Sequence, residues 1–270
     1  MNPDVSIITI CLNDKTGLEK TIDSVSSQKF KNYEFIIIDG GSNDGSIDVI
    51  RKNTDLITYW VSEKDSGICN ALNKGLKKVQ GKYCFFLNSG DTLYDELVIE
   101  NIFKKERDED IVSGDIILFS DDGKEELVKS PETATFRHMY FSTLFYPVTF
   151  FKYELFINFG GFDENIKLSG DYDIFFRLLI KHNATYKRLP VIVVRFNTSG
   201  LSSHSKNAPL IATERKTIHD KYLSKRIQDE FFELNALKYS RPIVFWNWAK
   251  QYSILRNGLK FLYHTFKKIR

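Results

Sequence analysis

Short apolar runs alternate with helix-like segments along the first 119 residues, and this alternation constrains the fold more than any other feature of the sequence. The runs are rich in Ile, Val and Phe, as strands buried on both faces should be, and they cover residues 5–12, 35–38, 57–61, 83–87 and 111–119. The helix-like segments lie near residues 17–27, 46–53, 68–79 and 95–105. This order predicts βαβ units and a parallel sheet.

The rhythm changes after residue 119. Asp121-Asp122-Gly123 indicates a hairpin turn, and an aromatic-rich stretch follows over residues 136–159. Next come a predicted helix, a strand, a polar loop and a helical C-terminal region, over residues 171–182, 191–196, 197–207 and 209–270. We therefore expect an α/β domain over residues 1–208, with halves 1–119 and 120–208, and a helical extension over 209–270.

The cysteines and the N-terminus indicate a cytoplasmic protein. Three cysteines cannot all pair, and Cys11 and Cys84 lie in apolar runs, which favours buried free thiols over disulfides or metal ligands. The first residues lack the basic region of a signal peptide, and no apolar run approaches the ~20 residues that a membrane-spanning helix needs.

Acidic loops follow the predicted strands. Asp39, Asp65 and Asp91 each lie in a Gly-containing loop where a strand passes into a helix, and open α/β sheets bind their ligands at that edge. The loop after Asp39 fits neither GxGxxG nor GxxxxGK[ST], so its spacing excludes a dinucleotide fingerprint and a P-loop.

The first two loops have the composition of a nucleoside site. Asp39 can accept hydrogen bonds from ribose hydroxyls or a base N–H, while Asp65 would contact the nucleoside and Asn73 or Lys74 the phosphates. The alternative is that the polar residues of both loops only cap the helices that follow, through Asp44 or Ser46 and through Asp65 or Ser66.

The third loop has the composition of a metal site. Asp91, with the side-chain oxygens of Asn88 and Ser89, is a set of hard ligands suited to Mg²⁺ or Mn²⁺. The alternative is that Asp91 caps the next helix. His204, in a later polar loop, is a candidate metal ligand or phosphate contact, with a solvated histidine as its alternative.

Asp171 begins a predicted helix and is a candidate general base. The alternative is a first-turn acid favoured by the helix dipole. A helix dipole lowers the pKa of a carboxylate at the helix start, whereas a general base works best with a pKa nearer the working pH. For Asp171 to act as a base, burial or a neighbouring carboxylate such as Asp173 therefore has to oppose the effect of the dipole.

Together these motifs resemble the family-2 inverting glycosyltransferases with the GT-A fold. The resemblance runs from about residue 5 to residue 202, and the order of the motifs makes it specific. The motifs are residues 5–13, 39–46, 71–75 (ALNKG), 87–91 (LNSGD), 160–164 (GGFDE), 170–173 (GDYD) and 200–202.

The resemblance implies a Rossmann-type, mostly parallel sheet flanked by helices, with residues 1–119 as the nucleotide-sugar-binding half and residues 120–208 as the acceptor and catalytic half. It implies a nucleotide-diphosphate sugar, most often UDP-linked, and Mn²⁺ or Mg²⁺ as cofactor. The expected donor site comprises Ile10, Leu12, Asp39, Asp65, Asn73, Lys74, Asn88 and Ser89, with Asp91 and His204 on the metal.

In the mechanism that the resemblance implies, Asp171 takes a proton from an acceptor hydroxyl, which attacks the anomeric carbon opposite the diphosphate. The expected reaction transfers a hexose or N-acetylhexosamine to a saccharide acceptor, lipid-diphosphate-linked, in the synthesis of O-antigen, capsule or exopolysaccharide. The competing interpretations are a nucleotidyltransferase, which would need a basic, Gly-rich loop after the first strand, and a catalytically silent nucleotide-binding or scaffold protein.

The sequence departs from the family pattern near these sites. Gly40 replaces a frequent second Asp, and Leu12 replaces a frequent Tyr. Cys69-Asn70 replaces a Tyr-Asp pair of close relatives, and Tyr146 stands where many relatives have His. Gly170 replaces the Glu that precedes the base.

The C-terminal region is basic, although the chain as a whole is nearly neutral. Residues 241–270 hold seven Lys or Arg and no Asp or Glu, so residues 1–240 carry a net charge of about −4 within the overall +3. From about residue 243 the apolar positions Phe245, Trp248, Tyr252, Leu255, Leu259, Leu262 and Phe266 form one stripe of a predicted helix.

A basic helix with aromatics on its apolar face suits an anionic membrane surface, here the inner face of the plasma membrane. The alternative is that the stripe packs on the catalytic domain or on a second copy, as a homodimer. The region has no recognised nucleic-acid motif, and we expect no nucleic-acid partner.

Overall fold

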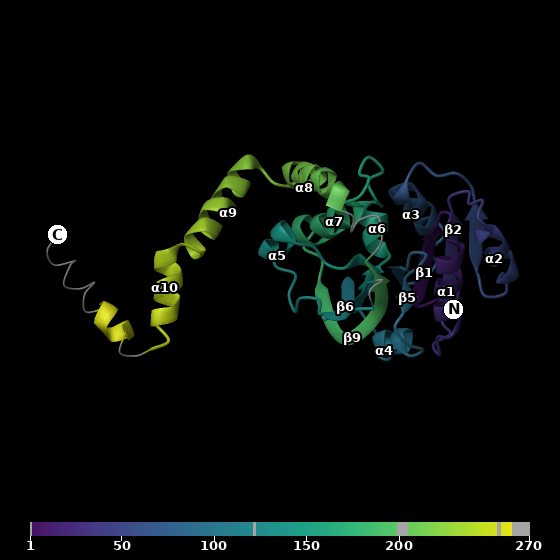
Figure 1. Cartoon of the computed structure of the whole chain (residues 1–270), viewed down its shortest axis with the longest axis horizontal. Helices are drawn as coiled ribbons and strands as arrows, with labels where there is room; N and C mark the ends of the chain where they lie inside the picture. Colours follow the sequence, from purple (N-terminus) through teal and green to yellow (C-terminus); the bar gives the residue numbers. More distant parts are fainter. Residues whose placement is uncertain (1, 121–122, 199–204, 253–254, 261–270) are drawn as a thin grey trace. The chain divides into compact units, whose positions relative to one another are not determined.

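The computed structural model describes residues 2–120, 123–198, 205–252 and 255–260, and the chain divides into two compact units, residues 1–219 and 220–270. The first unit carries the sheet, and the described residues of the second are mainly helical (Figure 1). The division falls inside α8 (Ala208–Tyr222), whereas the sequence pattern places it at residue 208.

The N-terminal half of the sheet is parallel. Its strands lie in the order β3-β2-β1-β4, which are Tyr59–Ser62, Tyr33–Asp39, Val5–Cys11 and Tyr83–Phe86. The connecting helices are α1 (Lys15–Ser26), α2 (Ser46–Lys52) and α3 (Ile68–Leu76) (Figure 1). Because the strands are parallel and in register, the loops that leave their carboxyl ends gather at one edge.

Strands of mixed direction complete the sheet. β8 (Thr149–Lys152) runs antiparallel to both β4 and β6 (Ile111–Phe119), and β9 (Tyr186–Asn197) runs parallel to β6. β5 (Thr92–Leu93) and β7 (Glu125–Val128) pair antiparallel with β9 and β6. The predicted α/β architecture, with a sheet flanked by helices and a helical C-terminal region, is confirmed.

Short helices cover this second half. Along the chain they are α4 (Val98–Phe103), α5 (Phe136–Phe141), the 3₁₀ turn η1 (Tyr146–Val148), α6 (Glu154–Phe159), α7 (Gly170–Phe175), the π-helix η2 (Phe176–Lys181) and the 3₁₀ turn η4 (Ser205–Asn207). The predicted helix over residues 171–182 is therefore an α-helix that widens into a π-helix after Phe175.

Both faces of the parallel strands are buried, which explains their nearly continuous apolar sequences. Ile7 belongs to the core cluster that includes Leu18 and Ile22 of α1. Ile8 points to the other face, where a Cβ at Gly75 of α3 would lie 2.5 Å from its Cγ2. Gly75 thus allows α3 to pack directly on β1.

The sequence pattern detects only the second part of β9, because the pairing of this strand with β6 is irregular in its middle. Its pairing with β6 begins at Tyr186, and the register shifts between Ser113 and Asp115 of β6. Pro190 lies in this stretch and has no N–H to donate to the ladder. The alternating apolar pattern therefore becomes clear only after the proline.

The predicted buried thiols are confirmed: Cys11, Cys69 and Cys84 are free and buried. In the part of the chain that the structure describes, no helix combines the length and the apolar character needed to cross a bilayer.

The second unit contains α9 (Lys225–Lys238) and α10 (Arg241–Ala249). α10 ends at Ala249 instead of running on as one helix from residue 243, and residues 255–260 are helical again. The aromatic stripe is nevertheless present, since the rings of Phe245 and Trp248 lie 5.8 Å apart and those of Trp248 and Tyr252 lie 5.2 Å apart. Leu262 and Phe266 lie outside the described residues.

Candidate active site

Asp39 lies at the carboxyl end of β2 and is fully buried. Its Oδ2 accepts hydrogen bonds from the N–H groups of Gly41 (3.0 Å) and Ser42 (2.9 Å) and from Oγ of Ser62 (2.5 Å). Its Oδ1 is buried and accepts no hydrogen bond from any described residue. One oxygen is therefore used to hold the loop, and the other is available to a ligand donor.

Asp65 and Leu12 converge on Gly40. A Cβ at Gly40 would lie 2.6 Å from Oδ2 of Asp65 and 3.3 Å from Cδ1 of Leu12. The close approach of the Asp65 carboxylate leaves no room for a side chain at position 40 and explains why this position holds Gly. Asp65 also accepts a hydrogen bond from the N–H of Gly67 (3.1 Å), which fixes the turn before α3. Ile10, partly buried, pairs with Ile38 beside this site.

Asp91 lies in the loop after β4 and is buried. Burial, aided by the charge of Asp14, raises the pKa of Asp91 well above its ordinary value. Asp14 is held in turn by Oγ of Ser89, which donates to its Oδ2 over 2.7 Å. Oδ1 of Asn88 is buried without a hydrogen bond from any residue that the structure describes.

The structure thus brings together the desolvated carboxylate of Asp91 and the unused amide oxygen of Asn88, with the Asp14 carboxylate nearby. A divalent cation would fit the chemistry of Asp91 and Asn88, because it would neutralise like charges and satisfy the orphaned oxygen. Among the described residues, however, no three His, Cys, Asp or Glu side chains gather into a cluster that could hold a metal on its own. His204 lies outside the described residues.

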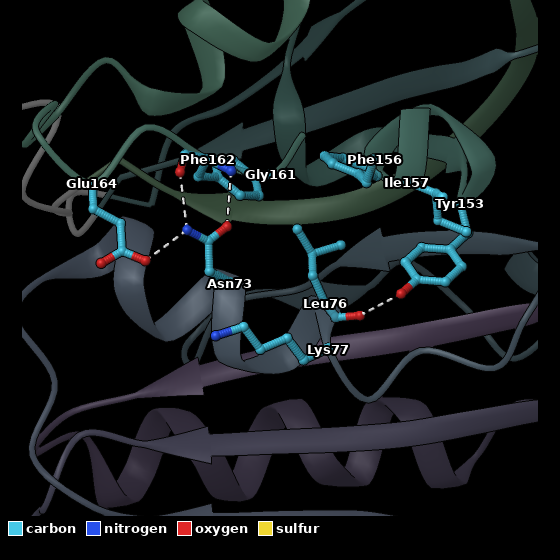
Figure 2. Close-up of a pocket in the computed structure, with 9 residues that line it drawn as sticks. All are labelled: Asn73, Leu76, Lys77, Tyr153, Phe156, Ile157, Gly161, Phe162 and Glu164. Carbon is cyan, nitrogen blue, oxygen red and sulfur yellow. Dashed lines mark hydrogen bonds between the residues drawn. The ribbon is translucent and has the colours of Figure 1, made fainter. Parts of the chain in front are cut away.

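Asn73 and Lys74, on α3, hold loops together. The Asn73 amide accepts from the N–H of Phe162 (2.8 Å) and donates to its C=O (2.9 Å) and to Oε1 of Glu164 (2.8 Å). Lys74 pairs with Glu63 at 2.9 Å. Figure 2 shows Asn73 beside a cavity of about 320 Å³ whose lining includes none of Asp39, Asp65, Asp91 and Asp171.

Asp171 lies in the first turn of α7 and is partly buried. Burial raises its pKa, while the backbone N–H groups of Tyr172 and Asp171 and the guanidinium of Arg215 act in the opposite direction. Burial thus overcomes the lowering that a helix start imposes on a carboxylate. Asp173 lies toward Arg177, with its Oδ2 4.0 Å from Nη1 of the arginine. Burial therefore explains why the pKa of Asp171 is raised, and no contribution from Asp173 is needed.

Gly170, the residue before Asp171, is in close contact with the side chain of Cys69. A Cβ at Gly170 would lie 2.6 Å from Sγ of Cys69, whose thiol donates to the C=O of Ile166 (3.3 Å). Burial, followed by the charge of Asp171, raises the pKa of Cys69 to about 12. The two departures from the family pattern are therefore linked, since a side chain at position 170 collides with this neutral thiol.

Tyr146 of η1 is influenced by both Asp91, in the loop after β4, and Asp171, the predicted base. Burial raises the pKa of its hydroxyl well above the ordinary value, and the charges of Asp171 and then Asp91 add to the shift. The hydroxyl has no hydrogen-bond partner among the described residues. Asp91 and Asp171, 80 positions apart in the sequence, thus act on one buried phenol.

Sequence reasoning missed Asp14 as a member of this site. The signal was available, because Asp14 follows the first strand as Asp39, Asp65 and Asp91 follow later ones. It was hidden because Asp14 also caps α1, accepting from the N–H of Gly17 at 3.1 Å.

The doubly covered sheet and the acids at its carboxyl edge define a GT-A-type glycosyltransferase. Residues 6–162 match the model of glycosyl transferase family 2, and the chain belongs to this family.

Three similar proteins illustrate the relationship. An uncharacterised glycosyltransferase of Mycobacterium tuberculosis is 28% identical over 227 residues, covering 82% of this chain and 86% of its own. The poly(ribitol-phosphate) β-N-acetylglucosaminyltransferase TarP of Staphylococcus aureus is 38% identical over 117 residues, 41% of this chain and 36% of TarP. The crystal structure of S. aureus TarS residues 1–349 with UDP-GlcNAc superposes with a TM-score of 0.65 at 16% identity, covering 88% of this chain and 74% of that one.

The contact between positions 69 and 170 yields a stability prediction. Gly170→Ala should lower the free energy of unfolding by about 1–3 kcal/mol, because the new methyl group overpacks against Cys69. In a Cys69→Ala background the same change should be close to neutral. The thiol is then absent, and the higher helix propensity of alanine, up to about 1 kcal/mol, offsets any remaining crowding. Urea denaturation of the four proteins measures the coupling.

Gly258→Ala is the matched control, because nothing lies within 4 Å of a Cβ at that position. It should not destabilise the protein. Equal costs of Gly170→Ala in both backgrounds would show that the thiol does not set the requirement for glycine.

Proposed function

We propose that this glycosyltransferase is an inverting, metal-dependent enzyme that transfers a hexose or N-acetylhexosamine from a UDP-sugar to a saccharide acceptor. The acceptor is lipid-diphosphate-linked, and the product belongs to a cell-surface polysaccharide of the O-antigen, capsule or exopolysaccharide kind. The observation that carries the proposal is the carboxyl edge of the parallel strands. Buried Asp39 ends β2, buried Asp91 follows β4 on the other side of β1, and Oδ1 of Asp39 accepts no hydrogen bond from a described residue.

The donor proposal is supported by the carboxyl edge of the parallel strands. Oδ1 of Asp39 is buried and free to accept a hydrogen bond from a nucleoside donor, and an unsatisfied buried carboxylate oxygen is costly unless a ligand uses it. Asp65 and Leu12 flank the same loop, while Ile10, Asn73, Lys74 and Ser89 stay predicted contacts. UDP-GlcNAc in TarS and the name of TarP support the choice of nucleotide and sugar class.

In the proposed site Asp91 and Asn88 would hold Mn²⁺ or Mg²⁺, with His204 as a further predicted ligand. When bound, it supplies positive charge that offsets the charge developing on the departing diphosphate.

Asp171 acts as the general base. Its carboxylate takes the proton of the acceptor hydroxyl as the oxygen attacks the anomeric carbon, and the bond from that carbon to the diphosphate oxygen breaks on the opposite face. A raised pKa favours this role, because a base whose pKa lies nearer the working pH is a stronger proton acceptor.

A panel of nucleotide sugars tests this function. The full chain, incubated with each sugar, an acceptor saccharide and Mn²⁺, should release UDP from a UDP-hexose or UDP-N-acetylhexosamine and should lose this activity when EDTA is added. Asp171→Asn should bind UDP with unchanged affinity and transfer sugar at least about 100-fold more slowly, since it cannot accept the proton.

Two outcomes contradict the proposal. Transfer by Asp171→Asn at the wild-type rate would remove Asp171 as the base. Tight UDP binding without turnover of any sugar in the panel would favour the silent nucleotide-binding or scaffold protein instead.

The C-terminal unit supports a second proposal, that residues 243–270 bind an anionic membrane surface and bring the enzyme to a lipid-linked acceptor on its cytoplasmic side. Phe245, Trp248 and Tyr252 are each about half exposed, and residues 234–270 contain eight Lys or Arg and no acidic residue. Aromatic rings that face water beside cations match the chemistry of the membrane interface.

Liposome flotation tests the membrane proposal. The full chain should float with vesicles that contain anionic lipid, with less binding at high salt, because each cation near the surface contributes about 1 kcal/mol. A version ending at Ser240 should stay at the bottom of the gradient. Zwitterionic vesicles are the control for the charge requirement.

Equal flotation of the two versions would defeat the proposal. A concentration-dependent dimer of the full chain that does not float would instead support packing of the stripe on a second copy.

A further inference from the structure

Helix α8 contacts the turn that carries Asp171 through a carboxylate. Oε1 of Glu214 accepts the N–H of Lys167 (2.7 Å), and Oε2 accepts the N–H groups of Leu168 (3.1 Å) and Ser169 (2.9 Å). Ser169 is the N-cap residue of α7, but its side chain makes no cap hydrogen bond. A residue 45 positions away therefore satisfies the amide groups at the entrance to α7.

Arg215, the next residue of α8, contacts the same turn from the side. Its Cζ lies 4.6 Å from the centre of the Tyr172 ring, and its charge acts on Asp171. Its Nε is buried with no hydrogen-bond partner among the described residues. Tyr172 is itself fixed, because its hydroxyl donates to the C=O of Met139 over 2.6 Å.

From these contacts we propose that Glu214 and Arg215 are positioning residues for the base. Glu214 fixes the turn of residues 167–169 that delivers Asp171. Arg215 packs on the ring of Tyr172 and so holds its positive charge beside the residue that follows Asp171. The inference rests on the proposed function, because it assigns these roles toward a transferase base.

The geometry distinguishes this arrangement from an ordinary surface cap. Three consecutive amide groups share one carboxylate, and hydrogen bonds to a charged acceptor are about twice as strong as neutral ones. The family places Glu before the base, but Gly170 takes that position here. An acid from a distant helix therefore contacts the segment that contains the substitution.

The groups around Asp171 show which charge lowers the pKa of its carboxyl group. The charge of Asp171 acts on Cys69 of α3 and on Tyr146 of η1, and the raised pKa values of both groups keep them neutral. Cys69 packs against Gly170, the residue before Asp171. Asp173, on its own helix, lies toward Arg177. Arg215 of α8 is the cation whose charge lowers the pKa of Asp171.

The first test uses Glu214→Gln in the full chain with the active UDP-sugar. The glutamine replaces one acceptor oxygen with an NH₂ group that faces backbone N–H groups, so the turn should loosen. We expect kcat to fall about 10- to 100-fold while the KM for the donor changes less than about twofold, because the donor loops lie on other elements. Thermal melting verifies that the variant folds.

A second readout needs no turnover. Amide hydrogen exchange of residues 167–169 should be at least about tenfold faster in Glu214→Gln than in the wild type, since their acceptor is impaired. Unchanged exchange and unchanged kcat would overturn the role of Glu214. A wild type that turns over no nucleotide sugar would instead contradict the proposed function, and hydrogen exchange would still report on the turn.

The third test compares pH profiles. Loss of the positive charge in Arg215→Gln should raise the pKa of Asp171 and move the acid limb of kcat/KM to higher pH, with activity recovered above that limb. Arg215→Lys should keep the limb near that of the wild type, and Lys216→Gln, which alters an exposed cation one residue further along, is the matched control. A profile of Arg215→Gln that matches the wild type would overturn the role of Arg215.

Discussion

The parallel register of β1 with its neighbours determines where the acidic side chains of the donor half lie. Cys11 pairs with Asp39, and Asp39 pairs with Ser62, so the three strands end side by side. The hydrogen bond from Ser62 to Asp39 depends on this alignment. A shift of one residue would turn the Asp39 side chain to the opposite face of the sheet, away from Ser62. The core and the candidate site are thus specified by the same pairing.

Several carboxylates at one edge of the sheet repel one another and lose hydration on burial, and the fold offsets these costs differently at each of them. Asp39 uses one oxygen for backbone amides, and Asp171 has the charge of Arg215 nearby. For Asp91 no cation among the described residues contributes to the pKa shift, which reflects burial and then the charge of Asp14. A bound divalent cation would relieve this accumulation of negative charge.

The sequence predicts local features well and long-range ones poorly. Asp39 and Asp91 could be found because each follows a recognisable apolar strand, and their loops obey simple spacing. The partners of Asn73 and Gly170 could not, because Phe162 and Cys69 are about 90 to 100 residues distant along the chain. Glu214 belongs to the same class, since nothing in α8 as a sequence indicates which amides it contacts. The end of α10 at Ala249 likewise interrupts a stripe whose periodicity continues.

The central claim is that a base on α7 drives a single displacement at the anomeric carbon of a donor bound at the carboxyl edge of the sheet. The configuration of the product measures this directly. NMR of the anomeric proton, on the saccharide formed from an α-linked UDP-sugar, should show a β linkage, because the acceptor attacks opposite the departing diphosphate. An α linkage would contradict the single displacement and the role of Asp171 as its base.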